Sequence, residues 1–237
     1  MGFLIIMANS TRTQPGTERK STQKEPDPLI AITAFYETNK KIISTVTTII
    51  VVIVAGYFGY TKLYKGPAEE KAATALSYPQ LYLQVDSLGM ALNGDGKNPG
   101  FAKIAKKYDG TAAGNLAHYY EGVCYLKMGD YGNAIKALKE FNGKGTMVGN
   151  MASGLLGEAY MESGDNAKAI ESFKKATSDK DDALVTPMYL YDLGLAYEAT
   201  NNANEAKAAF KRIRDEYPKS MHARDIDKEL ARLGELD

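Results

Sequence analysis

The chain has 237 residues, 44% of them hydrophobic and 24% charged, which is the composition of a folded protein rather than a disordered or fibrous one. Its 29 Lys and Arg balance 29 Asp and Glu, so no excess of basic charge points to a nucleic acid partner. The single cysteine, Cys124, excludes an intramolecular disulfide, and two histidines far apart in sequence match no metal-ligand spacing.

The first segment, residues 1–28, is polar and contains prolines. We predict a disordered tail here, because the segment has too few apolar side chains to offset the entropy lost on ordering. The true start of the protein is either Met1 or Met7, because the polar tail begins directly after Met7. Residues 29–41 are predicted to form a short amphipathic helix next to the membrane.

Residues 42–61 form a run of twenty residues without a charge, between Lys41 and Lys62. A helix of this length spans about 30 Å, the thickness of a bilayer core, whereas a buried strand ends after about 4 to 8 residues. Aromatic side chains gather at its far end, as in an interfacial belt: Tyr57, Phe58, Tyr60 and Tyr64. We therefore predict a single transmembrane helix over residues 42–64, an uncleaved signal-anchor because about forty residues precede it.

The orientation of this helix follows from the lengths of its flanks, since the nearest lysines are equal in number on the two sides. The positive-inside rule counts short loops, whereas long domains cross the membrane regardless of charge. The short N-terminal flank carries six Lys and Arg. We therefore expect the N-terminus in the cytoplasm and the large C-terminal domain outside.

Residues 65–113 are predicted to form a helical pair. A helix over residues 68–92 is followed by a glycine-rich break at 93–100 and a shorter helix over 101–108. At the other end of the chain, residues 221–237 are predicted to contain a polar-faced helix that covers the open end of the domain.

Three segments within residues 114–220 share one pattern. Each has a glycine, a tyrosine three residues later, an alanine twelve later and a Leu or Phe sixteen later. The matched glycines are Gly122, Gly157 and Gly194, and the matched large residues are Leu138, Phe173 and Phe210. The small residues let two antiparallel helices approach closely, while the larger side chains fill the space around the crossing.

The steps of 35 and 37 residues between these glycines are close to the 34-residue period of the tetratricopeptide repeat, or TPR. Residues 114–220 are therefore predicted to form three such repeats, and the pair at 65–113, which lacks the pattern, a degenerate one. The sequence as a whole predicts an all-α protein: a single N-terminal transmembrane helix followed by a tetratricopeptide-repeat helical solenoid with a C-terminal capping helix.

No set of residues has the spacing of a catalytic or cofactor site. The glycines of residues 93–100 follow no strand, and Lys97 lies before the last of them, unlike the lysine of a phosphate-binding loop. Cys124 stands where the other two repeats have Ala159 and Ala196, which indicates a small core residue rather than a nucleophile. We predict no enzyme, metal, cofactor or small-molecule ligand.

The surface with functional potential is the concave inner face formed by the first helix of each repeat. Its predicted lining comprises Leu116, Tyr119, Val123, Leu126, Met151, Glu158, Met161, Met188, Tyr191, Leu195 and Glu198. A largely apolar surface with adaptable methionines suits an apolar or helical polypeptide. An equally open alternative is that some of these side chains pack against the first helical pair or the terminal helix.

The layout from residue 29 to 237 resembles the YfgM-type ancillary subunit of the bacterial Sec translocon. The resemblance rests on FYETNKK at Phe35–Lys41, a membrane helix ending in GYFGYTKLY, and an acidic repeat domain. It implies a place in the inner membrane with the repeats in the periplasm. It also implies, as partners, translocon subunits, a membrane-bound periplasmic chaperone of the prolyl-isomerase type, or exported polypeptides.

Two other functions stay open. The chain would serve as a structural adaptor of another envelope complex, in secretion, outer-membrane assembly or cell division, if the membrane helix and the convex surface made the contacts. Alternatively, the repeats would regulate an enzyme elsewhere in the membrane.

Overall fold

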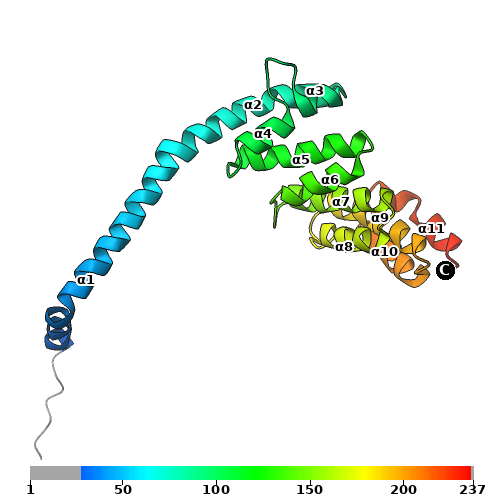
Figure 1. Ribbon diagram of the computed structural model, residues 1–237. Helices are drawn as coiled ribbons and strands as arrows, with labels where there is room; N and C mark the ends of the chain where they lie inside the picture. Colours follow the sequence, from blue (N-terminus) through cyan, green and yellow to red (C-terminus); the bar gives the residue numbers. More distant parts are fainter. Residues whose placement is uncertain (1–27, 236–237) are drawn as a thin grey trace, which may run out of the picture. The chain divides into compact units, whose positions relative to one another are not determined.

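The computed structural model describes residues 28–235, and this part of the chain contains helices and no strand (Figure 1). A long apolar N-terminal helix precedes a helical repeat region, which confirms the predicted all-α fold class. The predicted tail up to residue 27, with the choice between Met1 and Met7, lies outside the described residues. The chain divides into two units, residues 1–56 and 57–237.

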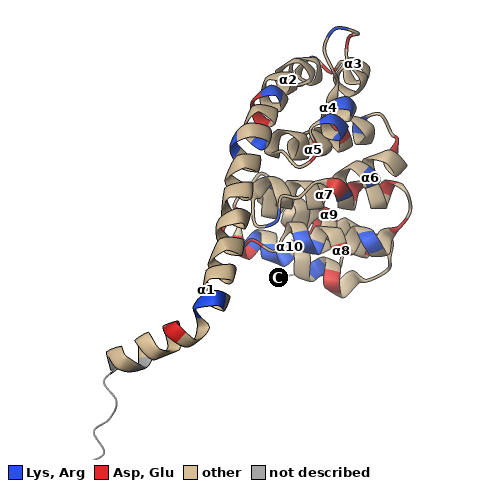
Figure 2. Cartoon of the chain, turned by 60° about the vertical axis from the view of Figure 1, so that its left-hand side comes forward, with Lys and Arg blue, Asp and Glu red and all other residues tan. Residues whose placement is uncertain are grey.

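Helix α1 (Pro28–Gly59) carries the apolar run, which Figure 2 shows as a tan stretch of ribbon between segments that bear blue basic residues. Its apolar side chains are exposed: Ile49 is 53% exposed, and Val52 and Ile53 are each 64% exposed. About twenty apolar residues in one helix are enough to span the hydrocarbon core of a bilayer. Among the described residues, it is the one helix whose length and composition fit a membrane anchor or a signal sequence.

Helix α1 runs without interruption through residue 41, where the sequence predicts a boundary between residues 29–41 and 42–64. The hydroxyls of Thr45 and Thr48 donate to the carbonyls four residues back, each at 2.8 Å, so they are satisfied within the helix itself. After Gly59 the chain forms a π-helical segment, η1 (Tyr60–Lys65).

The second unit is built from short helices that pack on their neighbours in chain order. They are α2 (Gly66–Gln84), α3 (Leu88–Asn93), α4 (Phe101–Lys107), α5 (Ala112–Lys127), α6 (Tyr131–Glu140), α7 (Met147–Glu162), α8 (Asn166–Ala176), α9 (Val185–Ala199), α10 (Ala203–Glu216), the 3-10 turn η2 (His222–Arg224) and α11 (Ile226–Arg232). The pairs α5–α6, α7–α8 and α9–α10 are the three hairpins of the solenoid (Figure 1).

The two helices of each hairpin approach each other closely at the glycine of the sequence pattern. A Cβ atom on Gly122, Gly157 or Gly194 would lie 2.5, 2.6 or 2.2 Å from the Leu or Phe sixteen residues later. These distances leave no room for a methyl group, so the glycines fix how closely the two helices pack. The turns at Gly129 and Gly164 have positive φ, and the aspartate after each glycine caps the next helix.

The helix predicted over residues 68–92 is interrupted between Gln84 and Leu88. Asp86 has a φ of 55°, and the N–H of Ser87 donates to the carbonyl of Tyr82 at 2.8 Å. This is the hydrogen-bond pattern of a helix end that normally uses glycine at the left-handed position. Because aspartate takes that position here, the sequence carries no glycine to signal the break.

The first helical pair is joined to the first repeat by hydrogen bonds. Both carboxylate oxygens of Glu69 on α2 accept from α5, from the N–H groups of Ala112 (2.6 Å) and Ala113 (2.8 Å). These are N–H groups of a first helical turn, which lack partners inside their own helix, and negative charge is favoured there. Phe101 and Ile104 of α4 are fully buried beneath α5.

The C-terminal end is covered by a shorter helix than predicted. Within residues 221–235, η2 is followed by α11, whose Ile226 and Leu230 are buried in the cluster formed with α9 and α10. Residues 236–237 lie outside the described part.

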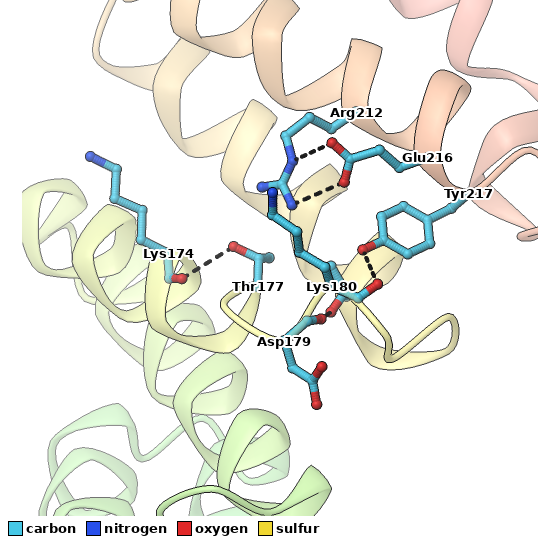
Figure 3. A network of polar contacts seen from close by, with 8 residues as sticks. Lys174, Thr177, Asp179, Lys180, Arg212, Glu216 and Tyr217 are labelled. Atoms are coloured by element: carbon cyan, nitrogen blue, oxygen red, sulfur yellow. Dashed lines mark hydrogen bonds and ion pairs between the residues drawn. The ribbon is translucent and has the colours of Figure 1, made fainter.

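The loop between α8 and α9 is held in place by polar contacts (Figure 3). The hydroxyl of Tyr217, at the end of α10, donates to the carbonyl of Lys180 at 2.8 Å. The hydroxyl of Thr186 donates to the carbonyl of Asp179 at 2.5 Å. The loop is therefore joined both to α9 and to the end of the following hairpin.

Replacing Tyr217 with phenylalanine is expected to cost about 1 kcal/mol, because the carbonyl of Lys180 loses its donor. Amide hydrogen exchange should accelerate in residues 178–184 and stay unchanged in α5 and α6. The matched control is Tyr197→Phe, since the Tyr197 hydroxyl forms no hydrogen bond with a described residue. Equal exchange in both variants would show that the contact does not hold the loop.

Candidate functional site

The candidate site is the inner face of the solenoid, formed by the first helices of the three hairpins. Helices α5 and α7 are in contact, as are α7 and α9, so the three first helices form one continuous layer. Inner-face residues recur at helical spacing along each of them. The predicted lining residues lie on these three helices.

On α5 the predicted residues differ in how accessible they are. Tyr119 is only 8% exposed, and its ring lies 5.5 Å from that of Phe141 and 5.3 Å from that of Tyr120, so it belongs to the core. Leu116 and Val123 are half-buried against the same cluster. Leu126 is half-buried and belongs to none of the hydrophobic clusters of the described residues.

On α7 and α9 the predicted apolar residues are half-buried. Met151, Met161, Met188 and Leu195 all pack along the edge of the largest hydrophobic cluster. Gly154 lies under the ring of Tyr189, which reaches across from α9. The inner face at this point is therefore a packed floor with partly accessible methionine and leucine side chains above it.

The end of the predicted face near α9 is covered by the C-terminal segment. The ring of Tyr191 lies 5.4 Å from His222 in η2 and 5.7 Å from Phe210. The carboxylate of Glu198 accepts a hydrogen bond from Arg232 of α11 at 2.7 Å. For these two residues the structure shows packing against the terminal segment, the alternative that the sequence left open.

Two carboxylates of the inner face have no cation beside them. Glu158 of α7 and Asp192 of α9 form no ion pair or hydrogen bond with any described residue. Burial raises the pKa of Glu158 to about 7, with smaller contributions from the charges of Asp192 and Glu162. Burial also raises the pKa of Asp192 to about 6. An ionised carboxylate that is desolvated and unpaired lowers the stability of the folded protein. Groups with pKa values shifted in this way are frequent at functional sites.

Asp192 was not among the predicted site residues. It is the one charged residue in the apolar sequence PMYLYDLGLAY of α9, and that isolation was the available signal. Periodicity assigns apolar residues to faces, but it does not show which polar neighbours will lack a partner. Burial raises the pKa of the Tyr189 hydroxyl, and the charges of both carboxylates raise it further.

The described residues contain no cluster of three or more His, Cys, Asp or Glu side chains arranged to hold a metal ion. Cys124 is fully buried, and burial raises the pKa of its thiol to about 11, so the thiol stays protonated at neutral pH.

Comparison with known protein families supports the helical repeat architecture. The model of the tetratricopeptide repeat-like domain matches residues 33–233, which is most of the chain. No curated protein matches the chain closely enough to count as a relative.

Proposed function

The chain belongs to the tetratricopeptide repeat-like domain family, and on that premise we propose that it binds polypeptide partners at a bacterial membrane. Domains of this family are protein-interaction modules that typically lack catalysis. The further proposals are that α1 anchors the protein in the membrane and that the inner face holds the partner.

The observation that carries this proposal is the pair of unpaired carboxylates, Glu158 and Asp192, among half-buried apolar side chains. A partner segment with apolar residues and a lysine or arginine would bury the methionines and supply the missing cation. Charge-assisted contacts in a partly desolvated groove favour such a segment over a neutral one. The site thus fits an apolar segment that carries basic residues.

We propose that the partners belong to the Sec export machinery. The anchor-plus-repeat layout resembles the YfgM-type ancillary subunit, which implies translocon subunits, a membrane-bound periplasmic chaperone or exported polypeptides. In this proposal the protein spans the inner membrane once, with its N-terminus in the cytoplasm and its repeats in the periplasm. Anchoring would raise the effective concentration of the inner face for chains that emerge at the membrane.

Photo-crosslinking in cells tests this proposal. A probe at Leu126 sits on the inner face without entering a hydrophobic cluster, and a probe at the exposed Ala208 of α10 is the matched control. We expect mass spectrometry to find translocon subunits, a chaperone or several exported chains captured at Leu126 and not at Ala208. Equal capture at both positions would exclude the inner face as the binding surface.

The adaptor function is favoured by a different observation, the exposed apolar surface of α1. If the membrane helix makes the essential contact, replacing residues 42–61 with leucines should abolish association while crosslinks from Leu126 stay absent. One dominant component of another envelope complex in the capture experiment would support this alternative over the Sec proposal.

A further inference from the structure

A cavity lies where the first two hairpins meet. It has a volume of about 940 Å3 and is bounded by the end of α6, the α6–α7 loop, the first part of α7, the end of α8 and the start of the α8–α9 loop. Its size is within the range of about 300 to 1,000 Å3 that is typical of ligand-binding pockets. The proposed function does not use it.

The cavity combines an apolar floor with a basic rim. Leu138, Phe141 and Leu156 supply the apolar side chains. Three lysines surround them, Lys139 from α6, Lys144 from the loop and Lys175 from α8, and none of the three forms an ion pair or hydrogen bond through its ammonium group with a described residue. Asp179 is the one carboxylate on the lining, and it accepts the N–H of Asp181 at 3.1 Å.

The loop that forms one wall is fixed by hydrogen bonds. The side chain of Asn115 on α5 donates to the carbonyl of Asn142 at 2.9 Å and accepts from its N–H at 2.8 Å. At the other end, the hydroxyl of Thr146 donates to the carbonyl of Gly143 at 2.7 Å and accepts from the N–H of Gly149 at 3.1 Å. The cavity is therefore formed in advance, which lowers the entropy cost of binding.

We propose that this cavity binds an acidic polypeptide segment of a partner, with an apolar side chain on the floor and flanking carboxylates at the three lysines. Net positive charge on the rim attracts carboxylates, and the apolar floor discriminates against a simple anion. The inference deepens the proposed function, and rests on it, by naming the chemistry of one partner segment. It gives the protein two binding surfaces of opposite charge preference, the inner face and this cavity.

The test uses the full chain in mild detergent and a fluorescein-labelled peptide in which one phenylalanine is flanked on each side by aspartate and glutamate. Fluorescence anisotropy should show saturable binding that weakens as salt rises from 50 to 200 mM. The triple variant Lys139→Gln, Lys144→Gln, Lys175→Gln should bind at least tenfold more weakly. The control Lys103→Gln, Lys106→Gln, Lys228→Gln makes the same change in net charge at exposed positions outside the cavity and should bind like the unaltered protein.

Three results would overturn the inference: no binding by the unaltered protein, equal weakening in both triple variants, or equal affinity for a peptide with serine in place of phenylalanine. Circular dichroism of both triple variants guards against unfolding. The proposed function is judged separately by the crosslinks from Leu126. If the peptide does not bind but the crosslinks from Leu126 are retained, only the proposal for the cavity is contradicted. If the peptide binds but the crosslinks are absent, only the proposal for the inner face is contradicted.

Discussion

Replacing Gly154 with alanine is expected to destabilise the repeat domain by about 3 kcal/mol, although alanine is the better helix former by about 1 kcal/mol. A Cβ atom at this position would lie 1.9 Å from Cζ of Tyr189. The ring is 1% exposed, and its hydroxyl donates to the carbonyl of Met151 at 3.2 Å, so it has little freedom to move. The overlap must then be relieved by separating α7 from α9.

A double-mutant cycle measures whether that overlap is the cause. Tyr189→Ala alone should cost about 3 to 5 kcal/mol through the cavity it leaves. In that background Gly154→Ala should become neutral or stabilising, which corresponds to a coupling of about 3 kcal/mol or more. Denaturant unfolding of the full chain in mild detergent, followed by circular dichroism, gives the four free energies of unfolding.

Gly132→Ala on α6 is the matched control. A Cβ atom there would meet only the Asp130 side chain, at 4.0 Å, so this change should stabilise by about 0.5 kcal/mol. If Gly154→Ala stabilises in the same way, or if its cost persists without the Tyr189 ring, the close approach of α7 and α9 is not what limits this position.

The contrast between Gly154 and the three pattern glycines shows what the sequence was able to predict. Gly122, Gly157 and Gly194 recur with their large partners sixteen residues later, so the pattern revealed the packing within each hairpin. Contacts between hairpins have no such period. The side chain above Gly154 comes from the next repeat, and no comparison of repeats identifies it.

The candidate site shows the same limit. Spacing placed apolar residues on the first helices, but their accessibility depends on segments outside the repeats. Phe141, in a loop, helps to bury Tyr119, and His222, in the terminal turn, covers Tyr191. The sequence also did not predict the break at Asp86. The hydrogen bonds there are those of a helix end that normally has a glycine, but aspartate takes the glycine's place.

Neutralising the inner-face carboxylates is expected to make the domain more stable at high pH. The pKa of Glu158 is raised from 4.5 to about 7 and that of Asp192 from 3.8 to about 6. A carboxyl whose folded pKa is raised imposes no penalty below its unfolded pKa, and the penalty grows as pH rises to the folded value. The unaltered protein should therefore lose stability between about pH 4 and pH 7.

Glu158→Gln and Asp192→Asn should each stabilise the domain by about 1 to 3 kcal/mol at pH 8, allowing for partial solvent screening. The gain should nearly vanish at pH 4, where both carboxyls are protonated in either state. Glu171→Gln, at an exposed position on α8, makes the same charge change and should shift stability little at any pH. Parallel curves of stability against pH for all three variants would contradict the assigned burial of these charges.

The same two substitutions separate a binding role from a purely structural one. If a partner's lysine or arginine pairs with Glu158 and Asp192, the amide variants should be more stable at pH 8 and yet give fewer crosslinks from Leu126. Stability and binding then move in opposite directions, as expected where a site keeps charges that the fold alone does not favour. Higher stability with unchanged crosslinking would instead mean that the partner's contacts lie elsewhere on the domain.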